Sequence, residues 1–156
     1  MSEKFWENLT ENQDEAQFVW RMVRQAIERV GRQDILQNPA VLDLGGGAGE
    51  FAKYLNAQGL QCVSLDVQDW GTNPESQPIR GDAYKTPFAD GSFDIVHGYG
   101  IFDNAMYHHN FAKLLPEIAR ILKTRGILSI FGANSPPMEE LRKHFKSLEH
   151  SLWEKK

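Results

Sequence analysis

Cysteine is nearly absent from this 156-residue chain, in which Cys62 is the one residue of its kind. A disulfide framework within the chain is therefore excluded, and a reducing cytoplasm is the expected location. Cys62 falls in the apolar run Cys62-Val63-Ser64-Leu65. We expect its thiol to pack as a small hydrophobic group in a strand and not to act as a nucleophile.

Long hydrophobic runs and an excess of basic charge are missing as well. No apolar stretch approaches the ~20 residues of a membrane span, and the polar, acidic residues 2–14 lack the basic and apolar regions of a secretory signal. The formal net charge is −4, whereas nucleic-acid interfaces cluster Lys and Arg. We therefore expect neither a membrane nor a nucleic-acid partner.

Metal-ligand spacings are absent too. His108 and His109 are adjacent, so their side chains diverge, and the sequence contains no HExxH motif and no Cys/His pattern. We predict no metal site. With 41% hydrophobic and 24% charged residues, residues 1–156 have the composition of one globular domain.

The most informative segment that is present, residues 41–51, predicts a buried strand, a glycine-rich turn and the start of a helix. Apolar residues bracket Asp43, as in a parallel strand covered on both faces. Gly45, Gly47 and Gly49 permit positive φ angles and the close approach of a ligand to the backbone. Turns of this kind hold nucleotide-like ligands in open α/β sheets.

Apolar periodicity predicts strands that alternate with helices, hence an α/β fold with a doubly wound, mostly parallel sheet. A first helix begins near a Thr10/Gln13 capping box and ends at Gly31. The turn-rich residues 66–78 predict an irregular loop in place of a crossover helix. The remaining expected elements are strands at 40–44, 61–65, 78–80, 93–97 and 127–131 and helices at 50–58, 111–125 and 136–148.

Two of these helices carry specific expectations at their ends. Pro116 should kink the helix at 111–125 or mark a restart, and Gly126 should stop it. Ser135 is the expected N-cap of the last helix. Its buried stripe would consist of Met138, Leu141, Phe145 and Leu148.

Acidic residues end the second and third predicted strands. Asp66 lies roughly twenty residues after Gly45, the spacing of an acid that binds ribose hydroxyls. Asp82 stands between Gly81 and Ala83, and a carboxylate there can accept a hydrogen bond from an exocyclic amine such as that of adenine. Either aspartate alone is more often a turn cap. Together with the glycine turn, and in register with the strands, they indicate ligand binding.

These segments resemble the class I S-adenosylmethionine-dependent methyltransferases, in a subgroup similar to methyltransferase type 11 that acts mainly on small molecules. Residues 41–49 look like the first family motif, and Asp66-Val67 like the acid and apolar residue after the second strand. Residues 81–83 with 87–96 resemble the third motif and fourth strand, and 115–128 the helix and strand that follow.

The resemblance covers about 41–131 and implies an enzyme that transfers a methyl group from S-adenosylmethionine to a small-molecule acceptor by in-line displacement, leaving S-adenosylhomocysteine. No catalytic residue is assigned, and a general base is needed only if the acceptor must lose a proton. The cofactor-binding residues that it implies are Asp43, Gly45, Gly46, Gly47, Asp66, Val67, Asp82 and Ala83.

The chain also departs from the family pattern. The helix after the second strand is missing, Thr124-Arg125 replaces the usual Pro-Gly turn, and only residues 147–153 could supply a strand of the closing hairpin. We therefore expect a Rossmann-like methyltransferase fold shortened at the C-terminus, with a sheet edge open to a second copy or another partner. The expected division is an N-terminal cap helix region (1–32), a cofactor-binding core (38–135), and a C-terminal helix with room for one edge strand (136–156).

The acceptor side is less defined by the sequence. Residues 97–109 follow the fourth strand, where the family places its acceptor, and offer Tyr99, Asp103, His108 and His109 as contacts. The Asn/Asp-Pro-Pro-Tyr/Phe signature of amino-group methyltransferases is absent. Residues 5–30 carry costly apolar side chains, among them Trp20, and are expected to form part of the acceptor pocket.

Two other classes of function stay open. Residues 47–52 fit G-x-G-x-x-A, so that Asp66 would bind the ribose of NAD(P) in an oxidoreductase. The Gly81-Asp82-Ala83 segment and the lack of room for a second mononucleotide half speak against that class. The short C-terminus and missing acceptor motif are compatible with a non-catalytic, S-adenosylmethionine-binding partner or regulator of a larger enzyme.

Overall fold

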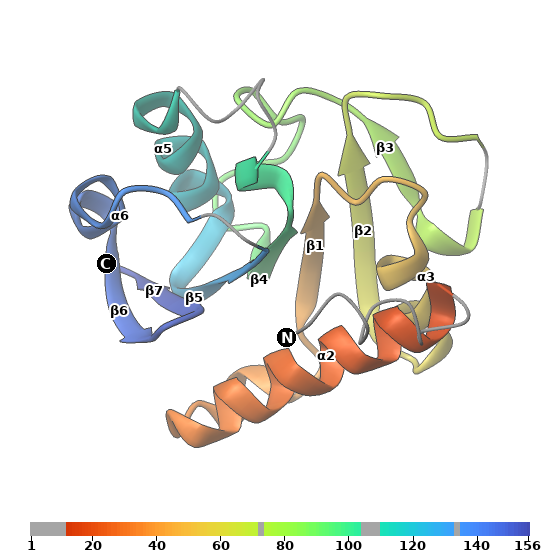
Figure 1. Cartoon of the computed structure of the whole chain (residues 1–156), viewed down its shortest axis with the longest axis horizontal. Helices are drawn as coiled ribbons and strands as arrows, with labels where there is room; N and C mark the ends of the chain where they lie inside the picture. Colours follow the sequence, from red (N-terminus) through yellow and green to blue (C-terminus); the bar gives the residue numbers. More distant parts are fainter. Residues whose placement is uncertain (1–11, 72–73, 104–109, 133–134) are drawn as a thin grey trace.

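A seven-stranded sheet in the order β3-β2-β1-β4-β5-β7-β6 forms the centre of the molecule (Figure 1). The computed structural model describes residues 12–71, 74–103, 110–132 and 135–156. None of the helices in these ranges combines the length and apolar composition of a membrane span. The elements are α2 (Asn12–Arg29), η1 (Gln33–Leu36), β1 (Ala40–Leu44), α3 (Glu50–Ala57), β2 (Gln61–Asp66), η2 (Pro74–Ser76), β3 (Pro78–Arg80), β4 (Phe93–Tyr99), η3 (Ile101–Asp103), α5 (Phe111–Ile121), β5 (Leu122–Phe131), α6 (Met138–His144), β6 (Phe145–Glu149) and β7 (Leu152–Lys155).

The strand order confirms the predicted doubly wound α/β fold. From β1 the chain builds outward through β2 to β3, then returns to place β4 on the other side of β1, where it builds outward again through β5. These pairings are all parallel. The reversal between β1 and β4 is the topological switch point, where sheets of this kind bind ligands at the carboxyl ends of their strands.

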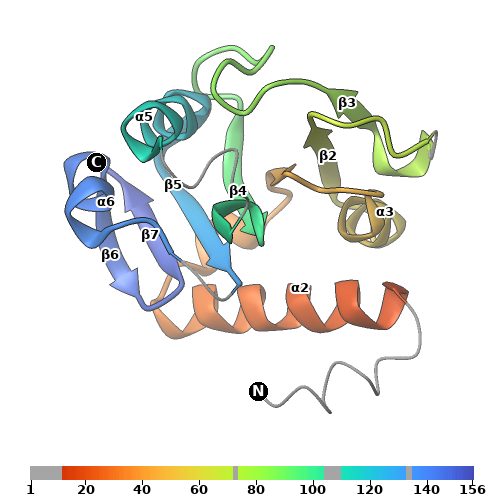
Figure 2. The ribbon, with the colours of Figure 1, turned by 45° about the horizontal axis from the view of Figure 1, so that its top comes forward.

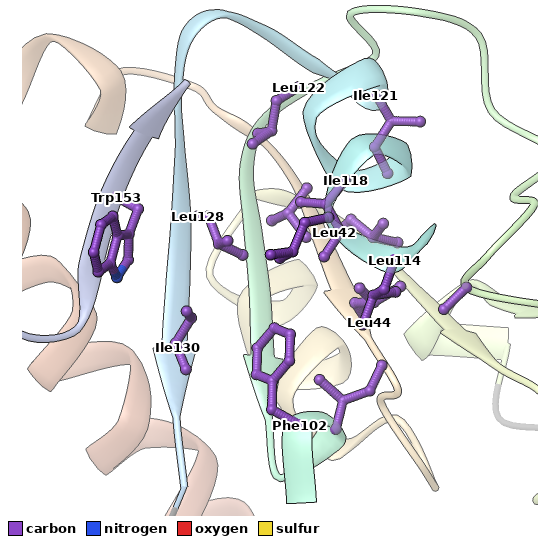
Figure 3. Close-up of a cluster of buried hydrophobic side chains, with 14 of the residues drawn as sticks. Leu42, Leu44, Phe102, Leu114, Ile118, Ile121, Leu122, Leu128, Ile130 and Trp153 are labelled. Carbon is purple, nitrogen blue, oxygen red and sulfur yellow. The ribbon is translucent and has the colours of Figure 1, made fainter. Parts of the chain in front are cut away.

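Helices cover both faces of the sheet and bury two apolar clusters. On one face, α2 and α3 pack against a row of side chains that crosses β2, β1, β4 and β5, here called the apolar row (Figure 2). On the other face, Leu114 and Ile118 of α5 lie against Leu42 and Leu44 of β1 (Figure 3). The apolar row consists of Cys62, Val41, Ile95 and Ile127.

Strands β1 and β3 have the predicted bounds. Between β2 and β3, where no crossover helix was expected, the described residues form only the short η2. The predicted end of α5 is wrong. The helix runs through Pro116 and ends at Ile121, and the chain passes directly into β5. Pro116 removes a single helical hydrogen bond, while the buried leucines and isoleucines of α5 hold the helix against the sheet. The left-handed conformation falls on Arg125, with φ 62°, and not on Gly126.

The C-terminal expectation is also corrected. The last helix begins at Met138 after Pro137, so Ser135 is not its N-cap, and it ends at His144. Phe145 and Leu148 have the i, i+3 spacing of a helix, but they lie in β6 on opposite faces of the sheet, one in each apolar cluster. In a strand, residues an odd number of positions apart point to opposite faces of the sheet.

Two strands therefore close the sheet where one was expected. β6 and β7 form an antiparallel hairpin, and β7 pairs with β5. The closing hairpin that the resemblance implies is therefore present, and the edges of the sheet are β3 and β6. A partner or second copy on either edge stays a prediction.

Candidate functional site

The glycine turn after β1 is fixed to the end of β2 by backbone hydrogen bonds. The amides of Gly45 and Gly46 both donate to the carbonyl of Leu65, at 2.7 and 3.1 Å. The amide of Gly47 donates to Asp66 Oδ2 at 3.0 Å. The predicted glycine turn and the predicted acid are thus one connected structure at the switch point.

Two glycines in this turn are required for different physical reasons. A Cβ on Gly46 would lie 2.1 Å from Ser64 Oγ and 2.7 Å from Asp43 Oδ2, so the strand floor approaches the backbone too closely for a side chain. Gly47 has φ 57° and no atom within 4 Å of the position of a Cβ. Its backbone therefore faces open space that a ligand can occupy.

A hollow of about 310 Å³, here called the β2 hollow, adjoins this turn. Asp66, Val67 and Ala83 line it, together with the exposed indole of Trp70. Asp66 Oδ1 also accepts from the amide of Gln68 at 2.9 Å. Because a carboxylate has about four acceptor positions, these backbone bonds orient Asp66 and still leave capacity for ligand hydroxyls.

Asp82 stands apart from the other predicted cofactor residues. It is exposed, and its Oδ1 accepts from the amide of Tyr84 at 2.8 Å, which is the geometry of a turn cap. Its neighbours Gly81 and Ala83 line the β2 hollow, whereas Asp82 itself is not part of the wall. The contact between Asp82 and adenine stays a prediction, and it requires the carboxylate to rotate toward the β2 hollow.

A second hollow, also about 310 Å³, lies between the glycine turn and helix α2 and is here called the α2 hollow. Glu15, Ala16 and Val19 of α2 form one side, and Phe51 and the predicted cofactor residues Asp43 and Gly46 belong to its wall. Three residues of the N-terminal segment that was predicted to form part of the acceptor pocket thus line a hollow at the switch point. Phe5 and Trp6 lie outside the described residues.

The two hollows meet. Gly45, Gly47 and Tyr99 line both of them. The charged residues of the α2 hollow are all acidic, namely Glu15, Asp43 and Glu50. An acidic wall favours cationic or uncharged ligand groups and disfavours carboxylates and phosphates.

A row of buried polar side chains underlies the α2 hollow. Ser64, Asp43, His97 and Ser129 are paired across β2, β1, β4 and β5, and none is more than 3% exposed. This polar row lies two residues beyond the apolar row on the same strands, and hence on the same face of the sheet. The face that packs on α2 and α3 therefore turns from apolar to polar at the switch point.

Burial shifts the two ionisable members of the polar row in opposite directions. It raises the pKa of Asp43 to about 7, with a further contribution from the negative charge of Asp66, and no hydrogen bond from the described residues offsets that shift. It lowers the pKa of His97 to about 3. His97 is therefore neutral at pH 7, and the charge of Asp43 responds to any cation brought near it.

His97 is the residue that sequence reasoning missed. Its ring stacks on Phe51 at 4.5 Å and 30°, and its Nδ1 lies 3.1 Å from Ser129 Oγ. The available signal was a histidine in an otherwise apolar strand, but its significance depends on a register with Asp43 that only the sheet provides. Of the acceptor contacts proposed from the sequence, Tyr99 lines both hollows. The side chains of Asp103, His108 and His109 lie outside the described residues.

Comparison with known proteins gives a consistent result. Residues 42–130 match the family described as methyltransferase domain. An uncharacterized protein of Methanocaldococcus jannaschii is 35% identical over 105 residues, which make up 66% of this chain and 40% of that protein. A demethylmenaquinone methyltransferase of Mycobacterium sp. is 33% identical over 101 residues, or 62% of this chain and 42% of that enzyme. The solved structure of a SAM-dependent methyltransferase of Methanosarcina mazei aligns with a TM-score of 0.55 at 21% identity, covering 72% of this chain and 61% of that one.

The switch-point hollows and the strand order define an α/β domain built to hold a nucleotide-like ligand at its glycine turn. Since the family match covers more than half of the 156 residues, the chain belongs to the class I S-adenosylmethionine-dependent methyltransferases. Their cofactor is S-adenosylmethionine, and the open space at Gly47 and the oriented carboxylate of Asp66 fit it. The chain spans less than half the length of the two curated relatives named above.

Proposed function

We propose that this domain transfers a methyl group from S-adenosylmethionine to a small-molecule acceptor, with the cofactor in the β2 hollow and the acceptor in the α2 hollow. The observation that carries the proposal is the junction of the two hollows at Gly45, Gly47 and Tyr99. A donor and an acceptor held on the two sides of that junction would meet there.

The residues of the β2 hollow have separate tasks in this proposal. Asp66 accepts the ribose hydroxyls while its bonds to the amides of Gly47 and Gln68 fix its orientation. Val67 and Ala83 pack against the adenine. Gly47 leaves room for the chain that connects the nucleoside to the reactive sulfur. The acidic Asp43, in the wall of the adjoining α2 hollow, favours the cationic end of that chain.

When bound, the cofactor supplies a methyl group on a positively charged sulfur, which a nucleophile displaces in line. The protein's part is to hold the two reactants at about 3–3.5 Å and aligned, and to keep water away. Val19 of α2 and Phe51 of α3 give the α2 hollow an apolar part, and Trp20 packs behind it, edge-on to Phe51 at 6.3 Å.

A small acceptor is supported by the size and charge of the α2 hollow. A volume of about 310 Å³ suits a metabolite, and the acidic wall together with a net charge of −4 does not suit nucleic acid. The Mycobacterium relative, by its name, methylates demethylmenaquinone, which is also a small molecule.

The decisive experiment has two parts. Calorimetry with the full chain should detect S-adenosylhomocysteine and S-adenosylmethionine, and both should bind more tightly than NAD. Incubation with methyl-labelled cofactor and a metabolite extract should then transfer label to a small molecule. Tighter binding of NAD would indicate an oxidoreductase. Binding without transfer to any acceptor would leave the non-catalytic partner as the function, and tight, salt-sensitive RNA binding would contradict a small-molecule acceptor.

A further inference from the structure

A buried ring nitrogen beside the α2 hollow makes no hydrogen bond within the described part of the fold. His97 is 1% exposed, and the described residues offer no hydrogen-bond partner to its Nε2. A buried N–H or ring nitrogen without a partner is costly, and such atoms in native proteins call for a specific explanation. The ring belongs to the wall of the α2 hollow, so a ligand bound in that hollow can supply the missing partner.

The position of the ring is closely fixed by its neighbours. Phe51 stacks on one side at 4.5 Å, and Phe131 lies 5.7 Å away at an angle of 57°. Ser129 holds Nδ1 at 3.1 Å. A side chain held by two aromatic neighbours and at one nitrogen presents the other nitrogen in a set direction, which is how binding sites achieve specificity.

The bond to Ser129 also determines which nitrogen carries the proton. If Nδ1–H donated to Ser129 Oγ, two buried groups would lack partners: the serine hydrogen and the bare Nε2. If the serine hydroxyl donates to Nδ1, only Nε2–H is left. Among the described residues Ser129 has no other hydrogen-bond partner, so the second arrangement is the more stable one. Nε2 is therefore a hydrogen-bond donor.

The donor and its surroundings together specify a ligand group. A neutral N–H requires an oxygen or nitrogen lone pair, and the acidic Glu15, Asp43 and Glu50 in the same wall disfavour an anion. We propose that His97 binds the methyl acceptor by donating from Nε2–H to an uncharged oxygen, such as that of a phenol, alcohol or ketone. This inference rests on the proposed function, because it assigns the α2 hollow to the acceptor.

Since Nε2 is covered from bulk water, contact with the ligand oxygen needs a small rearrangement of the hollow wall. The same cover excludes water as a competitor for the bond. A ligand that lacks the oxygen would leave Nε2–H without a partner, as in the free protein. The site would therefore discriminate strongly against such ligands.

The first test is nuclear magnetic resonance of the full chain labelled with ¹⁵N-histidine, with His97→Gln used to assign the signal. We expect Nε2, not Nδ1, to resonate as the protonated nitrogen. The opposite tautomer would overturn the proposal. This measurement does not depend on cofactor binding, so its result is separate from success or failure of the proposed function.

The second test measures binding of p-cresol, cyclohexanone and 4-methylbenzoate to the protein saturated with S-adenosylhomocysteine. We expect p-cresol and cyclohexanone to bind and to move the His97 Nε2 signal, and benzoate to bind at least about tenfold more weakly because of the acidic wall. His97→Gln places an amide N–H near the same point and should retain affinity within about threefold, whereas His97→Leu should lose about tenfold.

Several outcomes would overturn the inference while leaving the cofactor site intact. These are equal affinity of the neutral probes for wild type and His97→Leu, preference for benzoate, or no binding of either neutral probe. S-adenosylhomocysteine affinity serves as the fold control for both variants. If that affinity falls with the leucine variant as much as probe affinity does, His97 contacts the cofactor and the assignment to the acceptor is wrong.

Discussion

The β2 hollow and the α2 hollow meet at the same glycine turn but are built in different ways. The β2 hollow is made of turns and strand ends, and its acid, Asp66, is partly exposed and bonded to two backbone amides. The α2 hollow has a floor of buried side chains, of which Asp43 has a raised pKa and His97 a lowered one. The carboxylate of the β2 hollow has hydrogen-bond partners without a ligand, whereas His97 Nε2 in the α2 hollow has none among the described residues.

This difference teaches how the two binding tasks can be separated within one small fold. The wall of the β2 hollow is set by backbone geometry, so its shape should change little on binding. The α2 hollow stores unfavourable free energy in groups that burial has stripped of water, and a ligand with matching groups would release it. Substitutions in the two hollows should therefore have different signatures.

The largest effect is expected at the junction, where Gly47→Val should affect both hollows. A β-branched residue is strained at φ 57° and fills the open space beside the turn. We expect affinity for S-adenosylhomocysteine to fall by about 3 kcal/mol, roughly a hundredfold, as measured by calorimetry. Gly59→Val is the matched control, since Gly59 has φ 83° and open space but lies outside both hollows. Equal loss of affinity in both variants would mean that the effect is global.

The next effect is confined to the β2 hollow. Asp66→Ala removes the proposed ribose acceptor and the bond that holds the Gly47 amide, so cofactor affinity should fall by about 1.5–3 kcal/mol. Asp69→Ala is the control, because Asp69 caps the amide of Gly71 in the same loop. An unchanged dissociation constant in folded Asp66→Ala would remove Asp66 from the site.

The polar row predicts that the free energy of unfolding depends on pH. Its two ionisable members, Asp43 and His97, contribute with opposite signs. Asp43 has a folded pKa of about 7, above its unfolded value, so its contribution is present at low pH and lost as the pH rises through about 7. His97 has a folded pKa of about 3, below its unfolded value, so its contribution is present above about pH 6.5 and lost as the pH falls. Between about pH 4.5 and 6.5 the two slopes oppose each other.

Single substitutions should reveal the two slopes of the free energy of unfolding against pH separately. Urea unfolding at several pH values within that window would measure them. In Asp43→Asn, stability should rise with pH by about 1.4 kcal/mol per unit, and in His97→Leu it should fall by a similar amount. Glu117, whose pKa its hydrogen bonds with Arg120 lower to about 2, titrates below this window in the folded state. Parallel slopes in the two variants would show that the groups are not buried as described.

The same contrast explains what could be predicted from the sequence. The β2 hollow depends on residues close together in the chain, and the apolar run of β1, the glycine turn and Asp66 were all located from local pattern. The hairpin was missed because Phe145 and Leu148 have a spacing that fits either a helix or a strand with residues on both faces. Only the pairing of β6 with β7, which in turn pairs with β5, decides between the two.

The polar row could not have been predicted from local pattern. Its members Asp43, Ser64, His97 and Ser129 are far apart in the sequence, and each alone is an ordinary polar residue in an apolar strand. They become a site because parallel pairing aligns them at one level of the sheet. Asp82 differs from them, since a local pattern predicts its ligand contact; the structure shows its carboxylate accepting from a turn amide, and the ligand contact stays a prediction.

The smallest effect on cofactor affinity is expected from a substitution that enters only the α2 hollow. Ala16 is 3% exposed and lines that hollow from α2, so Ala16→Leu should fill part of the acceptor space without reaching the β2 hollow. Affinity for S-adenosylhomocysteine should stay within about threefold, or 0.6 kcal/mol. Transfer of label to the metabolite extract should fall at least about tenfold, because a displaced acceptor loses its alignment. Gln25→Leu, on an exposed position of the same helix, controls for added apolar surface and should change neither quantity. If Ala16→Leu instead lowers both quantities equally, the α2 hollow holds part of the cofactor, and the division of tasks between the two hollows is wrong.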